Sequence, residues 1–147
     1  MTVLLDQREV QRKGGLAAKY PVAYIVAQFL KKYRFQKVLD VTYGKGRFYR
    51  IYRPRVLVGA DIVRREWEIV PDLFIQKPVW GLRYERELQN YAFDLLVVDP
   101  PWGKPQRREE YSELWGTPQL IIDYAIKLAR ERETFALSLS TTTNYSV

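Results

Sequence analysis

Apolar residues in this chain follow two patterns: short uninterrupted runs, and longer stretches in which they recur with a helical period. The short runs are rich in branched residues and are bounded by polar, glycine or proline positions, which is typical of β-strands. In the last run, Phe135, Leu137 and Leu139 alternate with polar or small residues, so we expect one buried and one polar face. The runs predict strands at 37–41, 56–60, 73–76, 94–99 and 135–140.

The helical period covers two stretches, 19–33 and 117–132. Pro21 suits the first turn of the first helix, and Thr117-Pro118 supplies an N-cap and a first-turn proline for the second. We also expect shorter helices at 47–52 and 83–91.

Residues 1–18 mix apolar and charged positions without a period, so we expect this segment to be irregular. No repeat, linker or low-complexity tract divides the chain, which predicts a single domain over 1–147. Because the predicted strands alternate with helices, the fold class is α/β, with a mostly parallel sheet and helices on both faces.

Composition narrows the possible chemistry. The chain contains no cysteine and no histidine, which excludes disulfides and catalysis by Ser-His-Asp or Cys-His groups. The usual ligands of zinc and copper are also missing, so we expect no metal site. No stretch approaches the roughly 20 apolar residues that span a bilayer, and the start of the chain lacks a secretory pattern. We therefore expect a soluble, cytoplasmic protein.

The formal charge of +7 indicates an acidic partner, most commonly nucleic acid, although a solvated basic surface is the alternative. For the basic residues that follow the first two strands we favour the solvated surface: Lys45, Arg47, Arg50, Arg53, Arg55, Arg64 and Arg65. A second group, in the long loop after residue 102, is predicted to contact a phosphate backbone: Lys104, Arg107 and Arg108.

Polar motifs follow three of the predicted strands. The first strand runs into Asp40 and a turn containing Gly44 and Gly46, an order that can bring backbone amides close to a nucleotide-like ligand. Asp61 closes the second strand, where nucleotide-binding α/β folds place an acid that binds ribose hydroxyls. Asp99-Pro100-Pro101-Trp102 closes the strand at 94–99. Ligands bind beyond the carboxyl ends of such strands, so we expect the site there.

With these motifs in this order, the chain resembles the S-adenosylmethionine-dependent methyltransferases that act on exocyclic amino groups, adenine N6 or cytosine N4. Asp40 to Phe48 looks like the family's first motif, Asp61 like the acid of the second, and Asp99 to Trp102 like the catalytic motif in its adenine form. Lys19-Tyr20-Pro21 is similar to the segment that contacts the methionine part of the cofactor.

The resemblance implies a Rossmann-like methyltransferase fold, truncated after the fifth strand, with S-adenosylmethionine as cofactor. It implies cofactor binding by Lys19, Tyr20, Pro21, Asp40, Thr42, Gly44, Gly46, Asp61 and Ile62. It implies a catalytic role for Asp99, Pro100, Pro101 and Trp102. For Asp40, capping of the glycine turn is an equal alternative to direct contact with the cofactor.

The chemistry fits these residue types. An exocyclic amine is a poor nucleophile, and the Asp99 carboxylate and the Pro100 carbonyl can accept its two N–H groups in a geometry that the prolines fix in advance. Trp102 can stack on a base that has left the duplex, which contributes about 1 to 3 kcal/mol. Methylation of a cytosine ring carbon is excluded, because it needs a cysteine.

The family's sheet normally continues past the fifth strand with a helix and an antiparallel pair, which this sequence lacks. We therefore expect a minimal form, or completion by another chain or by a second copy at an open sheet edge. DNA adenine is the leading substrate. The alternatives are an RNA base, a protein glutamine, whose enzymes usually begin the motif with Asn and end it with Tyr, and a non-catalytic nucleic-acid-binding module of the same fold.

Overall fold

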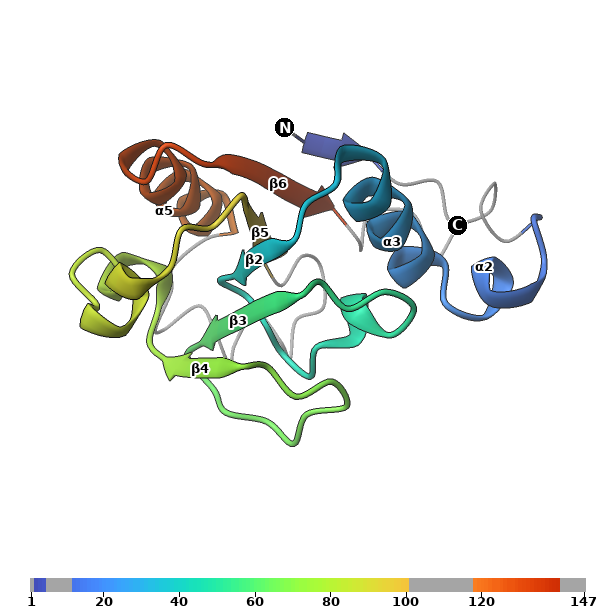
Figure 1. The fold of residues 1–147 in the computed structure, drawn as a ribbon, viewed down its shortest axis with the longest axis horizontal. Coiled ribbons are helices and arrows are strands. Elements are labelled where there is room, and N and C mark those ends of the chain that lie inside the picture. The colour runs from blue at the N-terminus through green and yellow to red at the C-terminus, as the bar shows by residue number, and fades with distance from the viewer. Residues whose placement is uncertain (1, 5–11, 101–117, 141–147) are drawn as a thin grey trace.

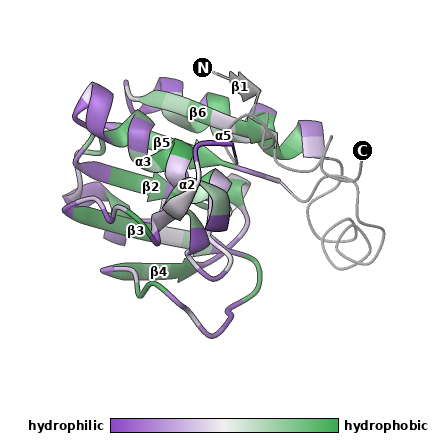
Figure 2. Cartoon of the chain, turned by 90° about the vertical axis from the view of Figure 1, so that its right-hand side faces the viewer, coloured by the Kyte–Doolittle hydropathy of each residue, from purple (hydrophilic) through white to green (hydrophobic). Residues whose placement is uncertain are grey.

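The computed structural model describes residues 2–4, 12–100 and 118–140 (Figure 1). Its centre is a six-stranded sheet in the order β1-β6-β5-β2-β3-β4, which follows the strand labels from top to bottom in Figure 2. Every neighbouring pair of strands is parallel. The strands are β1 (Thr2–Leu4), β2 (Lys37–Asp40), β3 (Val56–Asp61), β4 (Leu73–Gln76), β5 (Leu95–Val98) and β6 (Phe135–Ser140).

Helices cover both faces of this sheet, as the sequence predicts. The α-helices are α2 (Gly15–Lys19), α3 (Pro21–Tyr33) and α5 (Pro118–Glu131), and the 3-10 helices are η1 (Arg47–Tyr49), η2 (Val79–Gly81) and η3 (Arg86–Asn90). Val26 and Leu30 of α3 pack with Val38, Leu57 and Leu95. On the other face, Ile121 and Ala125 of α5 pack with Leu39, Val58 and Leu96. Successive residues of a strand point to opposite faces of the sheet. Because both faces are covered, both sets of side chains must be apolar, which explains the uninterrupted apolar runs.

The structure corrects four expectations. The segment 1–18 is not wholly irregular: β1 pairs with β6, and α2 begins at Gly15, after Gly14 in a positive-φ conformation. Because β1 lies beside β6, the strand at 135–140 is not an open edge. Ser138 is buried, since a layer covers each side of β6, whereas Phe135 at its start is exposed. Where a helix is expected at 83–91, the structure has only the short 3-10 helix η3, from Arg86 to Asn90.

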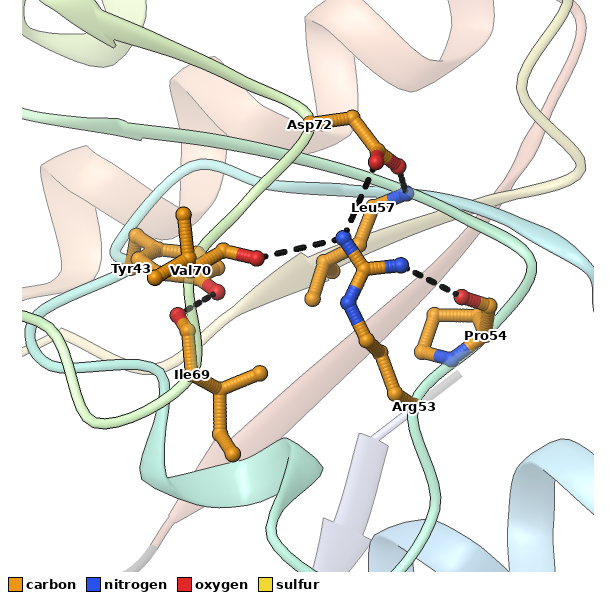
Figure 3. Close-up of polar contacts among 7 residues, drawn as sticks. All are labelled: Tyr43, Arg53, Pro54, Leu57, Ile69, Val70 and Asp72. Carbon is orange, nitrogen blue, oxygen red and sulfur yellow. Dashed lines mark hydrogen bonds and ion pairs between the residues drawn. The ribbon is translucent and has the colours of Figure 1, made fainter.

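Residues 62–72 connect β3 to its parallel neighbour β4, and this connection contains no helix. It lies on the α3 face, where Trp67 and Ile69 join the core cluster that contains Val26 and Leu30. Figure 3 shows how Arg53 holds its end: the guanidinium donates to the carbonyls of Pro54 and Val70, each at 3.1 Å, and pairs with Asp72 at 3.0 Å. In the same figure the Tyr43 hydroxyl donates to the Ile69 carbonyl at 2.7 Å.

The sheet order reverses between β2 and β5. β3 follows β2 in the chain and pairs with it on one side, whereas β5 comes after β4 and pairs with β2 on the other. In open α/β sheets such a reversal opens a crevice at the carboxyl ends of the strands, where ligands bind. Within the described residues, no helix combines the length and the apolar character needed to cross a bilayer.

Candidate active site

A hydrogen bond joins the ends of β2 and β5 at the point where the sheet order reverses. The backbone N–H of Asp99 donates to Oγ1 of Thr42 at 2.7 Å. One residue earlier, the N–H of Val41 donates to the carbonyl of Val97 at 3.0 Å, so the two strands stay paired up to the turn. The glycine-turn motif and the start of the Asp99-to-Trp102 motif, 57 positions apart in the sequence, are therefore in direct contact.

Asp40 lies beneath this contact and is fully buried. Its Oδ1 accepts the Thr42 N–H at 2.9 Å and the Thr42 hydroxyl at 3.4 Å, and its Oδ2 accepts the Tyr49 hydroxyl at 2.6 Å. Burial raises the pKa of Asp40 to about 7, although these hydrogen bonds oppose the shift. The contact with the Thr42 N–H is a local cap of the kind that the sequence allows for Asp40. Direct contact of Asp40 with a cofactor stays a prediction.

Asp61, at the end of the neighbouring strand β3, accepts a hydrogen bond from the glycine turn. Its Oδ2 accepts the Gly44 N–H at 2.9 Å, and its Oδ1 accepts the N–H groups of Ile62 at 2.8 Å and Val63 at 3.4 Å. Burial raises the pKa of Asp61 to about 6, so the carboxylate is ionised at neutral pH. A carboxylate has about four acceptor positions. A ribose hydroxyl would therefore share Asp61 with these three backbone donors.

The two glycines of the turn have different surroundings. Both have positive φ, 56° at Gly44 and 77° at Gly46, a conformation that favours glycine. A Cβ on Gly46 would lie 2.7 Å from the Tyr43 hydroxyl and 2.8 Å from the Ile69 carbonyl, whereas a Cβ on Gly44 would meet no described atom within 4 Å. Gly46 therefore permits close internal packing, and Gly44 leaves an open side where a ligand can approach the backbone.

The segment predicted to contact the methionine part of the cofactor joins α2 to α3. Tyr20 lies between the two helices, and Pro21 starts α3. The Arg50 guanidinium stands 4.7 Å from the centre of the Tyr20 ring, and the Lys19 ammonium 5.3 Å. Arg50 follows η1 directly, so the structure brings this segment beside the end of the first motif.

Part of the predicted site lies outside the described residues: Pro101, Trp102, Lys104, Arg107 and Arg108. Of the predicted catalytic motif, Asp99 is half-buried and Pro100 is buried.

Several basic residues that follow the first two strands have partners inside the molecule. Arg47 and Arg50 each donate to Glu68 at 2.8 Å, which lowers the pKa of that carboxyl. Arg64 stands 4.6 Å from the centre of the Trp67 ring. Arg47, Arg50 and Arg53 therefore hold the 62–72 segment against the fold, whereas the contact of Arg64 with Trp67 lies within that segment.

Sequence reasoning missed Tyr43 and Tyr49. Tyr49 is almost completely buried and donates to Asp40, and its ring stacks on that of Tyr43 with centroids 6.0 Å apart. Burial raises the pKa of both phenols, that of Tyr49 well above its ordinary value, so both are donors at neutral pH. In the sequence, these two residues are visible only as aromatic residues on either side of a glycine turn. That pattern does not indicate which group either hydroxyl contacts.

No family model matches this chain, and no curated protein matches it. The interpretation of the site therefore rests on its geometry: a glycine turn with one open side, an ionised acid at the end of β3, and a half-buried aspartate at the end of β5. These groups give a ligand access to the backbone at Gly44 and place carboxylates that can accept hydrogen bonds near it.

Proposed function

We propose that this chain is an S-adenosylmethionine-dependent methyltransferase that acts on an exocyclic amino group of a nucleic-acid base, with adenine N6 in DNA as the leading substrate. The observation that carries the proposal is the 2.7 Å hydrogen bond from the Asp99 N–H to Thr42. It unites the two motifs that need to act together, at the edge where α/β sheets bind ligands. The order β4-β3-β2-β5-β6 also supports a Rossmann-like methyltransferase fold.

The residues that would hold the cofactor surround the glycine turn. Gly44 offers its open side, and Asp61 retains an acceptor position for a ribose hydroxyl, with Ile62 next to it. Lys19, Tyr20 and Pro21 would bind the methionine part. When bound, S-adenosylmethionine supplies a methyl group that its positively charged sulfur already activates.

The chain's own contribution is to bind and orient the amine. The Asp99 carboxylate would accept one N–H of the substrate amino group, and the Pro100 carbonyl the other. Thr42 holds the main chain at Asp99, and Thr42 is itself held by Asp40, which accepts from Tyr49. The φ angle of Pro100 is restricted by its ring, and its side chain is buried, so the acceptors keep one orientation. Such positioning before reaction is a recognised source of catalysis.

A second candidate is a non-catalytic module of the same fold, since all of the observed contacts of Asp61 are internal. RNA bases and protein glutamine remain alternative substrates for an active enzyme. Binding of S-adenosylmethionine, measured by calorimetry, separates the enzyme hypotheses from the module, because only an enzyme needs the cofactor.

The decisive experiment measures transfer of a labelled methyl group to duplex DNA, single-stranded DNA, structured RNA and a protein extract. We expect N6-methyladenine in DNA, and a loss of at least about 100-fold in Asp99→Asn, which keeps the shape but not the charged acceptor. Asp123→Asn, at an exposed position of α5, is the matched control and should retain activity. Full activity in Asp99→Asn would contradict the role of the motif. Label in RNA or protein alone would change the substrate class.

A further inference from the structure

The charges of this chain are unevenly distributed along the sequence. The segment from Arg12 to Arg55 contains 12 of the 24 lysines and arginines and a single acid, Asp40, which is buried. The other residues carry 12 basic and 16 acidic side chains. Since β2 lies inside the sheet, the surface of this segment is formed by α2, α3, η1 and the turns between them. Figure 1 shows α2 and α3 next to each other, away from α5.

Three of these cations already have acidic partners on the 62–72 segment: Arg47 and Arg50 pair with Glu68, and Arg53 with Asp72. The others that are exposed have no ion pair with an acid in the described part of the chain. We name this set the basic face: Arg12, Lys13, Lys19, Lys31, Lys32, Arg34, Lys45 and Arg55. The basic face therefore has positive charge that the fold itself does not neutralise.

Aromatic rings support some of these side chains. The Lys13 ammonium stands 5.5 Å from the centre of the Tyr24 ring, and that of Lys31 5.5 Å from Tyr52. A ring beneath a lysine restricts its flexible stem and keeps the charged end at the surface. These cations lose less conformational freedom on binding than free lysines do.

The length of the basic face indicates what it binds. α3 has 13 residues and is therefore about 20 Å long. Lys13 and Lys19 precede its start, and Lys31, Lys32 and Arg34 lie at its end. A compact anion would contact only one of these two groups. Duplex DNA carries one charge for roughly every 1.7 Å of its axis and would contact both.

The basic face also leads to the candidate site. A turn of three residues connects the end of α3 to the start of β2, so the end of α3 lies at the amino edge of the sheet. Its start, with α2 and η1, therefore lies toward the carboxyl edge, where Asp99 contacts Thr42. We propose that the basic face binds the phosphate backbone of duplex DNA and directs the duplex to that edge; this rests on the proposed function for the class of substrate.

The test compares two triple variants with the same net charge. Lys13→Gln/Lys31→Gln/Lys32→Gln removes three charges from the basic face, and Arg86→Gln/Lys127→Gln/Arg130→Gln removes three exposed charges that lie outside it. Binding of a short fluorescent DNA duplex is measured against salt concentration, without S-adenosylmethionine. We expect the first variant to bind about tenfold more weakly or worse, with the slope of log K against log salt reduced by about 0.9 for each phosphate that is no longer neutralised. The second variant should bind like the wild type.

Equal reductions in affinity for both variants would overturn the proposal, since they would show an effect of total charge alone. A parallel measurement uses vesicles of phosphatidylserine and phosphatidylcholine. Binding of vesicles but not of duplex through the basic face would also overturn it. The assay requires no methyl transfer. A chain that binds DNA through the basic face but transfers no methyl group would therefore refute the proposed function and leave this surface assigned.

Discussion

Asp40 is the residue at which burial and charge oppose each other most directly. It is fully enclosed, and its pKa is raised by burial from 3.8 to about 7. The folded protein therefore holds a proton at Asp40 that the unfolded chain has already released at intermediate pH. Asp61, with its pKa raised to about 6, has the same sign. A group of this kind makes the free energy of unfolding decrease as pH rises from about 4 to about 7.

Replacing Asp40 by asparagine should remove its share of this pH dependence. The asparagine side chain is neutral at all of these pH values and keeps an acceptor for the Thr42 N–H. Between pH 5 and pH 8 we expect the wild type to lose on the order of 2 kcal/mol more of its free energy of unfolding than Asp40→Asn, measured by urea unfolding. Parallel pH curves for the two proteins would show that Asp40 is ionised in the folded state throughout this range.

The elements around the glycine turn depend on the close approach of a ring to a strand. Tyr43 packs directly over Gly59 of β3, where a Cβ would lie 2.5 Å from two carbons of the ring. The ring also reaches the 62–72 segment through its hydroxyl. One aromatic side chain thus connects the turn after β2, the middle of β3 and the crossover to β4.

Gly59→Ala should therefore destabilise the fold by about 1 to 3 kcal/mol, because the ring must move. Gly81→Ala is the matched control: its Cβ would lie 3.6 Å from the nearest atom, an ordinary contact. In a Tyr43→Ala background, Gly59→Ala should lose most of its effect. A double-mutant cycle by chemical denaturation measures this coupling, and strictly additive changes would contradict the contact.

Most elements could be predicted because their signals are local. The strand at 73–76 has the predicted bounds, and Pro21 does start a helix, as its position indicates. β1 could not be predicted, since three residues give no period and their partner, β6, lies more than a hundred positions away. The burial of Ser138 was missed because its strand pattern resembles one with a solvated face. The α/β class of the fold can be predicted from local patterns. Which strands form the edges of the sheet depends on pairing between segments that are far apart in the sequence.

The position of the candidate site could be predicted from the sequence, but its hydrogen bonds could not. Asp40, Asp61 and Asp99 lie at the ends of strands, so their common edge was predictable. Which oxygen meets which donor depends on the path of the turn. The sequence therefore did not indicate that Thr42 would contact Asp99, or that Tyr49 would donate to Asp40.

At the scale of the whole molecule, β1 completes one side of the sheet. It pairs with β6 in register from Thr2 opposite Ser138 to Leu4 opposite Ser140. Without it, the backbone groups of β6 would be exposed, and such an edge is a template for pairing with other chains.

Deleting residues 1–4 should lower the free energy of unfolding by about 1 to 3 kcal/mol, which corresponds to a few backbone hydrogen bonds. We also expect a concentration-dependent dimer, seen by sedimentation velocity, as two uncovered β6 strands pair. A deletion variant that is monomeric at high concentration and as stable as the wild type would show that β1 contributes nothing to this edge.

The pairing of β1 with β6 also orders events during folding. Among the described strands, β1 comes first in the chain, whereas its partner β6 comes after all the others. A contact between such distant segments closes a very long loop, which makes it slow to form. The α3 helix and the strands β2 to β5 can assemble beforehand from nearer contacts. Docking of β1 on β6 is therefore expected as a late folding step, and residues 2–4 stay accessible to chaperones and proteases until it occurs.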